Sequence, residues 1–487
     1  MAGEEEAVSI THGLQWTELR ISCPDATGLG CDIARLMFEF GLTVTKGDFS
    51  TDGKWCFLLF HVANRSDETR LWTSFRHRLE EVCTPAFRGL PGEEDGREAL
   101  ARAVGAGSAE CYLLKVDTAD RAGALFDVVT VLNENDIMVH RAHASTSPIG
   151  RAIDLFYISD QRKELPAQAR VDQLIQCTCE RLSDASCTIT IGRAPDVLSS
   201  FNGTFLTLAP SCVDNKSARA ALSLHRSSSS SSSLEGGGSA SSHVRRFSSD
   251  SGETPNFGPS AFEGEDQSML FGGKVEVDID NKLSRVHTVI QMRSKDRKGL
   301  LYDLLRTLKD VNTQVSYGKI EVEPSTGLCQ MDVFVQEVNG AEGCTRIADS
   351  EMQQELCIRV HQALACPVRI SAVNLGSDEM CTQLIVGAAV DSGGRGRPRV
   401  LYDTSKVLKQ MSLSVFKMDM YLGNGAVTDK VCTNGNGNGD TTIDACAGTE
   451  KEEVHRFIVT DANGQPIPKA KLTVLASRVH DALMDVV

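Results

Sequence analysis

The sequence predicts an α+β fold of tandem βαββαβ units, each an antiparallel sheet with helices on one face. Three observations lead to this prediction. The pattern Asp-x-x-Gly-x-x-x-Asp occurs three times in the 487 residues, each copy follows an alternating, strand-like run, and each copy opens a helical run. One such turn would be an ordinary helix start, but three copies in one register indicate a repeated module.

The first repeat shows the order of elements. Alternating apolar residues predict a strand at 19–23, apolar residues at helical spacing predict a helix at 29–40, and a β-branched run predicts a strand around Val44. The turn Asp52-Gly53 and the apolar run 57–62 complete a hairpin, and a second amphipathic helix follows at 71–82. Short last strands at 187–191 and 368–372 are expected to close the second and third repeats. This order is the ferredoxin-like arrangement.

A fourth copy keeps the frame but differs at the turn. Asp403 follows Asp303 by 100 residues, while Gly396 and Arg399 stand where the third repeat has Asp296 and Gly299. The chain also stops before an expected last strand. We interpret this copy as degenerate, retaining packing more than ligand chemistry.

Changes in composition set the expected domains. Repeats are predicted at 14–88, 110–192, 285–374 and 380–487, the last with a low-complexity insertion at 423–453. A connector at 89–109 separates the first two. Seven consecutive serines lie within 193–284, whose composition is typical of a flexible linker. There Arg245-Arg246-Phe247-Ser248 resembles a basic-directed kinase site, so Ser248 is a candidate phosphorylation site.

The shared turn suggests how a ligand binds. An Asp between strand and helix is expected to cap the helix, and the Gly lets another group approach the first helical turn. Unpaired amides and the helix dipole there favour a carboxylate by about 0.3 to 1 kcal/mol. The second Asp of each copy, one helical turn further on, is expected on a solvated face; these residues are Asp32, Asp127 and Asp303.

With these motifs the chain resembles the ACT domain, and its tandem copies around a Ser-rich gap resemble the plant ACT domain-repeat proteins. The resemblance implies regulation without an attached enzyme, ACT–ACT pairing within or between chains, and a small ligand, commonly a free amino acid, at the strand–helix loop. It also implies a role in amino-acid or nitrogen-status sensing. The implied binding residues are Asp25, Gly28, Leu29, Asp120, Gly123, Ala124, Asp296, Gly299 and Leu300.

Other function classes find little support. A net charge of −15 argues against binding to nucleic acid or an anionic membrane, and no apolar run reaches the roughly 18 residues of a transmembrane helix. The amino terminus lacks a secretory signal, so a cytoplasmic location is expected, with the nucleus open. No Cys-x-x-Cys, phosphate loop or nucleophile elbow occurs, so no metal, cofactor or catalytic residue is expected. The alternative function is a scaffold for an unknown protein partner, without a small ligand.

Overall fold

A computed structural model describes residues 7–64, 72–84, 111–147, 149–194, 275–338, 344–375, 381–424 and 451–485. The predicted connector at 89–109, most of the predicted linker with Ser248, and most of the low-complexity insertion lie outside these ranges. No helix in the described part of the chain is long and apolar enough to cross a membrane.

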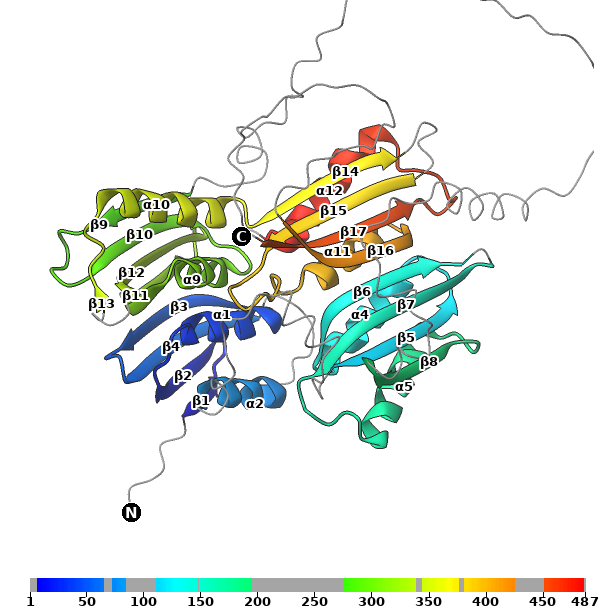
Figure 1. The fold of residues 1–487 in the computed structure, drawn as a ribbon, viewed down its shortest axis with the longest axis horizontal. Coiled ribbons are helices and arrows are strands. Elements are labelled where there is room, and N and C mark those ends of the chain that lie inside the picture. Colours follow the sequence, from blue (N-terminus) through cyan, green and yellow to red (C-terminus); the bar gives the residue numbers. More distant parts are fainter. Residues whose placement is uncertain are drawn as a thin grey trace, which may run out of the picture.

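The strands form two antiparallel sheets, and each sheet combines two repeats that are not neighbours in sequence (Figure 1). The first sheet joins repeats 1 and 3 in the order β1 (Val8–His12), β2 (Thr17–Pro24), β4 (Trp55–Asn64), β3 (Leu42–Thr51), β11 (Thr313–Glu323), β12 (Leu328–Val338), β10 (Thr288–Lys295) and β9 (Glu276–Asp280), with β13 (Cys344–Thr345) on β12. The second joins repeats 4 and 2 in the order β14 (Val368–Leu375), β15 (Cys381–Ala389), β17 (Lys451–Thr460), β16 (Ser414–Asn424), β6 (Ile137–Thr146), β7 (Arg151–Asp160), β5 (Tyr112–Ala119) and β8 (Thr188–Arg193).

Helices cover one face of each sheet and share one hydrophobic core with it. The first sheet carries α1 (Leu29–Glu39), α2 (Trp72–Cys83), α9 (Leu300–Asp310) and α10 (Ser350–Ala365). The second carries α4 (Ala124–Glu134), α5 (Gln168–Leu182), α11 (Val400–Gln410) and α12 (Lys469–Met484). Helix α1 packs on α9, and α4 packs on α11, so each pair of repeats is joined by strands and by helices. The predicted fold class is confirmed.

The edge strands differ from the sequence prediction. Residues 368–372 were expected to close repeat 3, but β14 pairs with β15 of repeat 4. Repeat 3 instead uses β9, which lies inside the predicted linker, and repeat 1 uses β1, which precedes its predicted start at residue 14. Repeats 1, 3 and 4 therefore run ββαββα, and repeat 2 keeps βαββαβ with β8. The outer edge of each repeat's first strand can pair with an antiparallel strand that comes either before or after the repeat in sequence. The local sequence pattern therefore does not determine which strand forms this edge.

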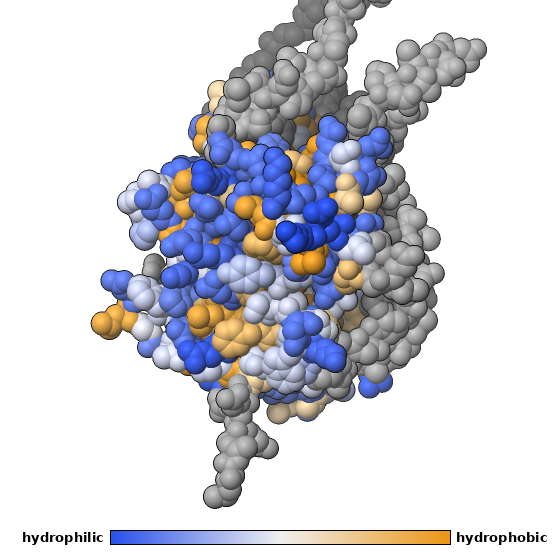
Figure 2. Space-filling model, turned by 90° about the vertical axis from the view of Figure 1, so that its left-hand side faces the viewer, coloured by the Kyte–Doolittle hydropathy of each residue, from blue (hydrophilic) through white to orange (hydrophobic). Residues whose placement is uncertain are grey.

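The surface of repeats 1 and 3 is mostly hydrophilic, with scattered apolar side chains (Figure 2). Exposed apolar side chains of the first sheet include Trp55, Phe57 and Tyr317.

The joint between repeats 1 and 3 depends on a glycine. Gly318 of β11 lies opposite Phe49 of β3, and a Cβ atom on Gly318 would lie 2.0 Å from the Phe49 ring. We expect Gly318→Val to lower the free energy of unfolding by about 1 to 3 kcal/mol because the joint becomes overpacked. Denaturant unfolding measures this. Combined with Phe49→Ala, the substitution should cost less than the two single costs added together; strict additivity would contradict the packing argument.

Candidate ligand sites at the four strand–helix turns

All four repeats begin their first helix with the same backbone turn. The residue before the helix has a left-handed φ of 80° at Gly28, 84° at Gly123, 75° at Gly299 and 67° at Arg399. Glycine adopts this conformation freely, whereas a residue with a Cβ atom pays about 1 kcal/mol or more. The fourth repeat therefore retains the turn that its sequence was expected to lose.

The first Asp of the motif does not cap its helix, contrary to the prediction. The carboxylate of Asp25 accepts a hydrogen bond from the Thr51 hydroxyl at 2.6 Å, and that of Asp120 accepts one from Thr146 at 3.1 Å. No side chain caps the helix at Gly28 or Gly123. The left-handed glycine turns the chain between Asp and helix, so the carboxylate instead reaches the end of the first hairpin strand, β3 or β6. The first amides of these helices thus remain without a side-chain acceptor.

The second Asp was predicted to be solvated, and this is wrong for Asp127 and Asp303, which are 5% and 2% exposed. Asp127 binds Lys409 of repeat 4 at 2.6 Å. Asp303 binds Arg397 of repeat 4 at 3.2 Å and Arg297 of its own repeat at 2.6 Å. The first helical turns lie where repeats meet, so these carboxylates pair with cations that are distant in sequence.

The turn of repeat 2 is filled by a lysine. A Cβ atom on Gly123 would lie 2.6 Å from Cγ of Lys409, and the Lys409 ammonium binds Asp127. Only about 20 Å³ remains open beside this turn. The predicted residues Asp120, Gly123 and Ala124 line this small space together.

The turn of repeat 3 is filled by two side chains. Phe38 of α1 and Arg397 both lie against Gly299, within 2.4 Å and 2.9 Å of a hypothetical Cβ atom. The Arg397 guanidinium lies over the Phe38 ring at 4.6 Å and donates to the Lys298 carbonyl at 3.0 Å. About 30 Å³ remains beside Asp296, Gly299 and Leu300.

The turn of repeat 1 keeps a cavity of about 80 Å³. Asp25, Gly28 and Leu29 line it on one side, and Lys309 of repeat 3 lines it on the other. A Cβ atom on Gly28 would lie 2.9 Å from the Lys309 ammonium, so this ammonium lies at the turn as Lys409 does in repeat 2.

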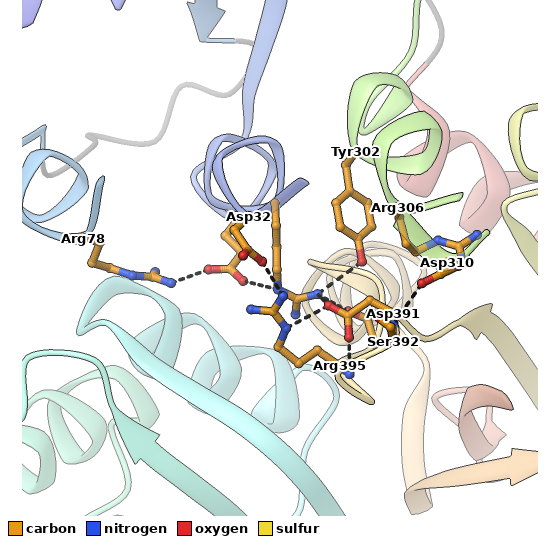
Figure 3. Close-up of polar contacts among 11 residues, drawn as sticks. Asp32, Arg78, Tyr302, Arg306, Asp310, Asp391, Ser392 and Arg395 are labelled. Atoms are coloured by element: carbon orange, nitrogen blue, oxygen red, sulfur yellow. Dashed lines mark hydrogen bonds and ion pairs between the residues drawn. The ribbon is translucent and has the colours of Figure 1, made fainter. Parts of the chain in front are cut away.

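Lys309 differs from Lys409 because its expected partner is taken. Asp32 is bound by Arg395 of repeat 4 at 2.6 Å, and Arg395 also binds Asp391 at 2.8 Å (Figure 3). Within the described ranges, no carboxylate pairs with Lys309. Repeat 1 therefore presents an uncompensated ammonium beside uncapped helix amides, an arrangement suited to a carboxylate.

The fourth turn borders the largest of these cavities, about 360 Å³, which we call the central cavity. It lies where repeats 1, 2 and 4 meet, and its lining includes Arg35, Glu39, Arg78, Asn133, Met138, His140, Arg399, Glu453 and His455. Arg35 ties this region together by donating to Glu39 at 3.0 Å and to the Gly396 carbonyl at 2.8 Å. Burial opposes ionisation of Glu39, but Arg78 and Arg35 outweigh it and hold its pKa below the ordinary value.

Sequence reasoning missed the central cavity because Gly396 and Arg399 were interpreted as a loss of ligand chemistry. A signal was present on β17. Glu453 and His455 occupy the strand positions that Cys56 and Leu58 occupy in repeat 1, which face the helices. Two ionisable residues at inward strand positions indicate a polar site rather than plain core packing.

Comparisons with known proteins agree with this architecture. Family models match residues 12–84 as the N-terminal domain of ACT domain-containing protein ACR10, residues 276–378 as the ACR9-like, ACT-like domain, and residues 382–429 as the C-terminal domain of ACR9. ACT domain-containing protein ACR9 of Arabidopsis thaliana is 31% identical over 83% of this chain and 84% of its own length. The chain is a plant ACT domain-repeat protein.

Other proteins are similar to all or part of this chain. Arabidopsis thaliana ACR10 is 30% identical over 93% of this chain and 92% of its own length. A bifunctional uridylyltransferase/uridylyl-removing enzyme of Azospirillum brasilense is 38% identical, over 21% of this chain and 10% of its own length. A structure of aspartate kinase from Synechocystis matches 79% of this chain and 56% of the kinase chain, with 13% identity and a TM-score of 0.23. The fold assignment rests on the sheet topology.

One buried carboxyl gives the second ACT domain a pH dependence. Burial, with a smaller contribution from nearby Asp120, raises the pKa of Asp154 to about 7. The folded protein then holds a proton that the unfolded chain releases near pH 4, so stability falls as pH rises from about 4 to 7, by at most about 1.4 kcal/mol per pH unit.

We expect Asp154→Asn to remove this loss. The free energy of unfolding of this variant should exceed that of the wild type by an amount that grows from pH 4 to 7 and levels off above pH 7. Denaturant unfolding at several pH values measures this difference. Asp172→Asn, on the exposed face of α5, is the matched control and should show no such trend. An advantage for Asp154→Asn that is equal at pH 4 and pH 8 would contradict the raised pKa.

Proposed function

We propose that this ACT domain-repeat protein is a non-enzymatic, cytoplasmic or nuclear regulator that binds a free amino acid at the Gly28 turn. The observation that carries the proposal is the Lys309 ammonium, which pairs with no carboxylate among the described residues and faces that turn across the boundary between repeats 1 and 3. Its counterpart Lys409 is neutralised by Asp127, and the space there is smaller. Amino-acid or nitrogen-status sensing is the role that such binding would serve.

The residues around the Gly28 turn complement an amino acid. Lys309 and the amides of Gly30 and Cys31 in the first turn of α1 would bind the α-carboxylate, since the Leu29 amide already donates to the Ala26 carbonyl. Asp25 accepts a hydrogen bond from Thr51 through one carboxylate oxygen, which leaves the other for the α-ammonium group. Leu58 and Leu305 form an apolar wall for the side chain. A cavity of about 80 Å³ favours a small amino acid.

Binding there would be relayed through the arrangement of repeats. The ligand would lie between repeats 1 and 3, and Asp32 on the same helix is bound by Arg395 of repeat 4. A change at the turn therefore reaches the second sheet through one ion pair. The ligand can shift this equilibrium only by its difference in affinity for the two arrangements, about 1.4 kcal/mol per tenfold.

Calorimetric titration with the twenty amino acids tests the proposal. We expect saturable binding that Gly28→Leu abolishes, because the added side chain would fill the cavity and collide with Lys309. Lys309→Met should weaken binding by about tenfold or more, because it removes the ammonium that contacts the carboxylate. Gly53→Ala is the matched control, because Gly53 has a similar φ of 85° but nothing within 4 Å of its Cβ position. It should leave binding unchanged.

A second prediction concerns Arg395. Arg395→Gln should release Asp32, which then pairs with Lys309 as Asp127 pairs with Lys409, and amino-acid affinity should fall about tenfold although no ligand contact is removed. Lys406→Gln, on the same helix as Lys409 but outside these ion pairs, should have no effect. Unchanged affinity in Arg395→Gln would show that the bridge does not keep Lys309 available.

The alternative function is a protein-interaction scaffold, and it too has support. The turns of repeats 2 and 3 are filled by the chain's own side chains, Lys409 at one and Phe38 with Arg397 at the other. These ACT domains would then serve assembly rather than ligand binding. If no amino acid binds in the titrations above, the scaffold becomes the better explanation.

A further inference from the structure

We infer that the edge of the second sheet formed by β14 is an interaction surface for a second copy of this chain. The two copies pair their β14 strands antiparallel about a two-fold axis, and this pairing joins their second sheets into one. The inference does not depend on ligand binding at the Gly28 turn.

Strand β14 has one side without a neighbouring strand. It pairs with β15 from Val368 to Leu375 without a register shift, and it is the first strand in the order of its sheet (Figure 1). Alternate residues of such a strand point their N–H and C=O groups away from the sheet. Among the described residues, no group outside β15 hydrogen-bonds to the main chain of β14. These outward groups can therefore accept another strand.

The other three sheet edges are shorter, and two of them are partly covered. β1 and β9 have five residues each and β8 has six, whereas β14 has eight. Arg76 donates to the Val8 carbonyl of β1 at 3.3 Å, and the Cys357 thiol donates to the Val277 carbonyl of β9 at 3.4 Å. Three carboxylates also lie along β9: Glu276, Asp278 and Asp280. Short length and charge are usual protections of edge strands.

Strand β14 lacks these protections. Its sequence contains no proline, glycine or lysine, and its pairing with β15 has no bulge. Its one charged side chain, Arg369, extends back over the sheet past Gly387 and binds Glu452 of β17. The charge is thus neutralised away from the edge. A long edge strand without charge, proline or bulge is a template for pairing with another strand.

The strand is complementary to a copy of itself. Residues directly opposite each other in an antiparallel pair lie on the same face, so a two-fold axis near the middle of β14 passes through Ser371 or Ala372. Arg369 then lies opposite Val373 or Leu375 of the second copy. In neither register does a charge face a like charge, and no carboxylate lies on the strand.

This pairing repeats the way in which the chain joins its own repeats. β3 pairs antiparallel with β11, and β16 pairs antiparallel with β6, with the helices of both repeats on one face. A two-fold axis perpendicular to the sheet keeps the helices of both copies on one face in the same way. The net charge of −15 makes two copies repel each other, so a contact at a neutral edge is the favourable one. One strand pair is a small interface, and we expect a weak, concentration-dependent dimer.

Sedimentation velocity of the full chain, from low to high micromolar concentration, tests the inference. The wild type should associate reversibly from monomer to dimer. Ser371→Lys should weaken the dimer by about tenfold or more, because it places an ammonium group at an exposed position close to the two-fold axis. Thr190→Lys, at an exposed position of β8 on the opposite edge of the same sheet, is the matched control and should dimerise as the wild type does.

Hydrogen exchange identifies the strand that makes the contact. Amides of β14 should exchange more slowly as the wild-type dimer forms, whereas those of β1, β8 and β9 should not change. Thermal unfolding should confirm that Ser371→Lys is folded. The inference is overturned if the wild type stays monomeric at every concentration, if folded Ser371→Lys dimerises as the wild type does, or if dimer formation leaves exchange in β14 unchanged.

Discussion

Ion pairs between repeat 4 and the second Asp of each other repeat hold the molecule together. Arg395 binds Asp32, Lys409 binds Asp127, and Arg397 binds Asp303. Each carboxylate belongs to the first turn of a helix, where the helix dipole also favours it. Only the pair of Arg397 and Asp303 is buried on both sides, with side chains 2% and 3% exposed. Removing one partner of such a buried pair leaves an uncompensated charge, which costs about 3 to 5 kcal/mol. Two of these pairs, Arg395 with Asp32 and Arg397 with Asp303, link the two sheets.

The four turns show how one backbone feature acquires different roles. The left-handed turn is common to all of them, and what differs is the group that faces it. Lys409 closes the turn of repeat 2, and Phe38 with Arg397 closes that of repeat 3. Repeat 1 keeps an open turn with a free ammonium, and repeat 4 opens onto the central cavity. The side chains that other repeats supply therefore determine how much space stays open beside each turn.

The sequence predicted what is local and missed what depends on contacts between repeats. The Asp-x-x-Gly register predicted the fold class, the repeat number and the position of the turns, because strand alternation and helical spacing are local signals. It did not predict β14 in the sheet of repeat 4, since an antiparallel edge strand fits from either side. It placed Asp127 and Asp303 in solvent because their partners in repeat 4, Lys409 and Arg397, lie 282 and 94 residues further along the chain. It treated repeat 4 as degenerate because Arg399 replaces the glycine of the turn, although Arg399 adopts the same left-handed backbone conformation.

The alternating partnership of repeats bears on how the chain is made. During synthesis from the amino terminus, repeats 1 and 2 emerge first, yet their partner strands β11 and β16 begin only at residues 313 and 414. Both early repeats must therefore keep an unpaired sheet edge until the second half of the chain arrives, and such edges invite wrong pairing. A ribosome that stalls before repeat 4 would leave repeat 2 without its partner strand, and it would leave the buried Asp303 of repeat 3 without Arg397, one of the two arginines that bind it.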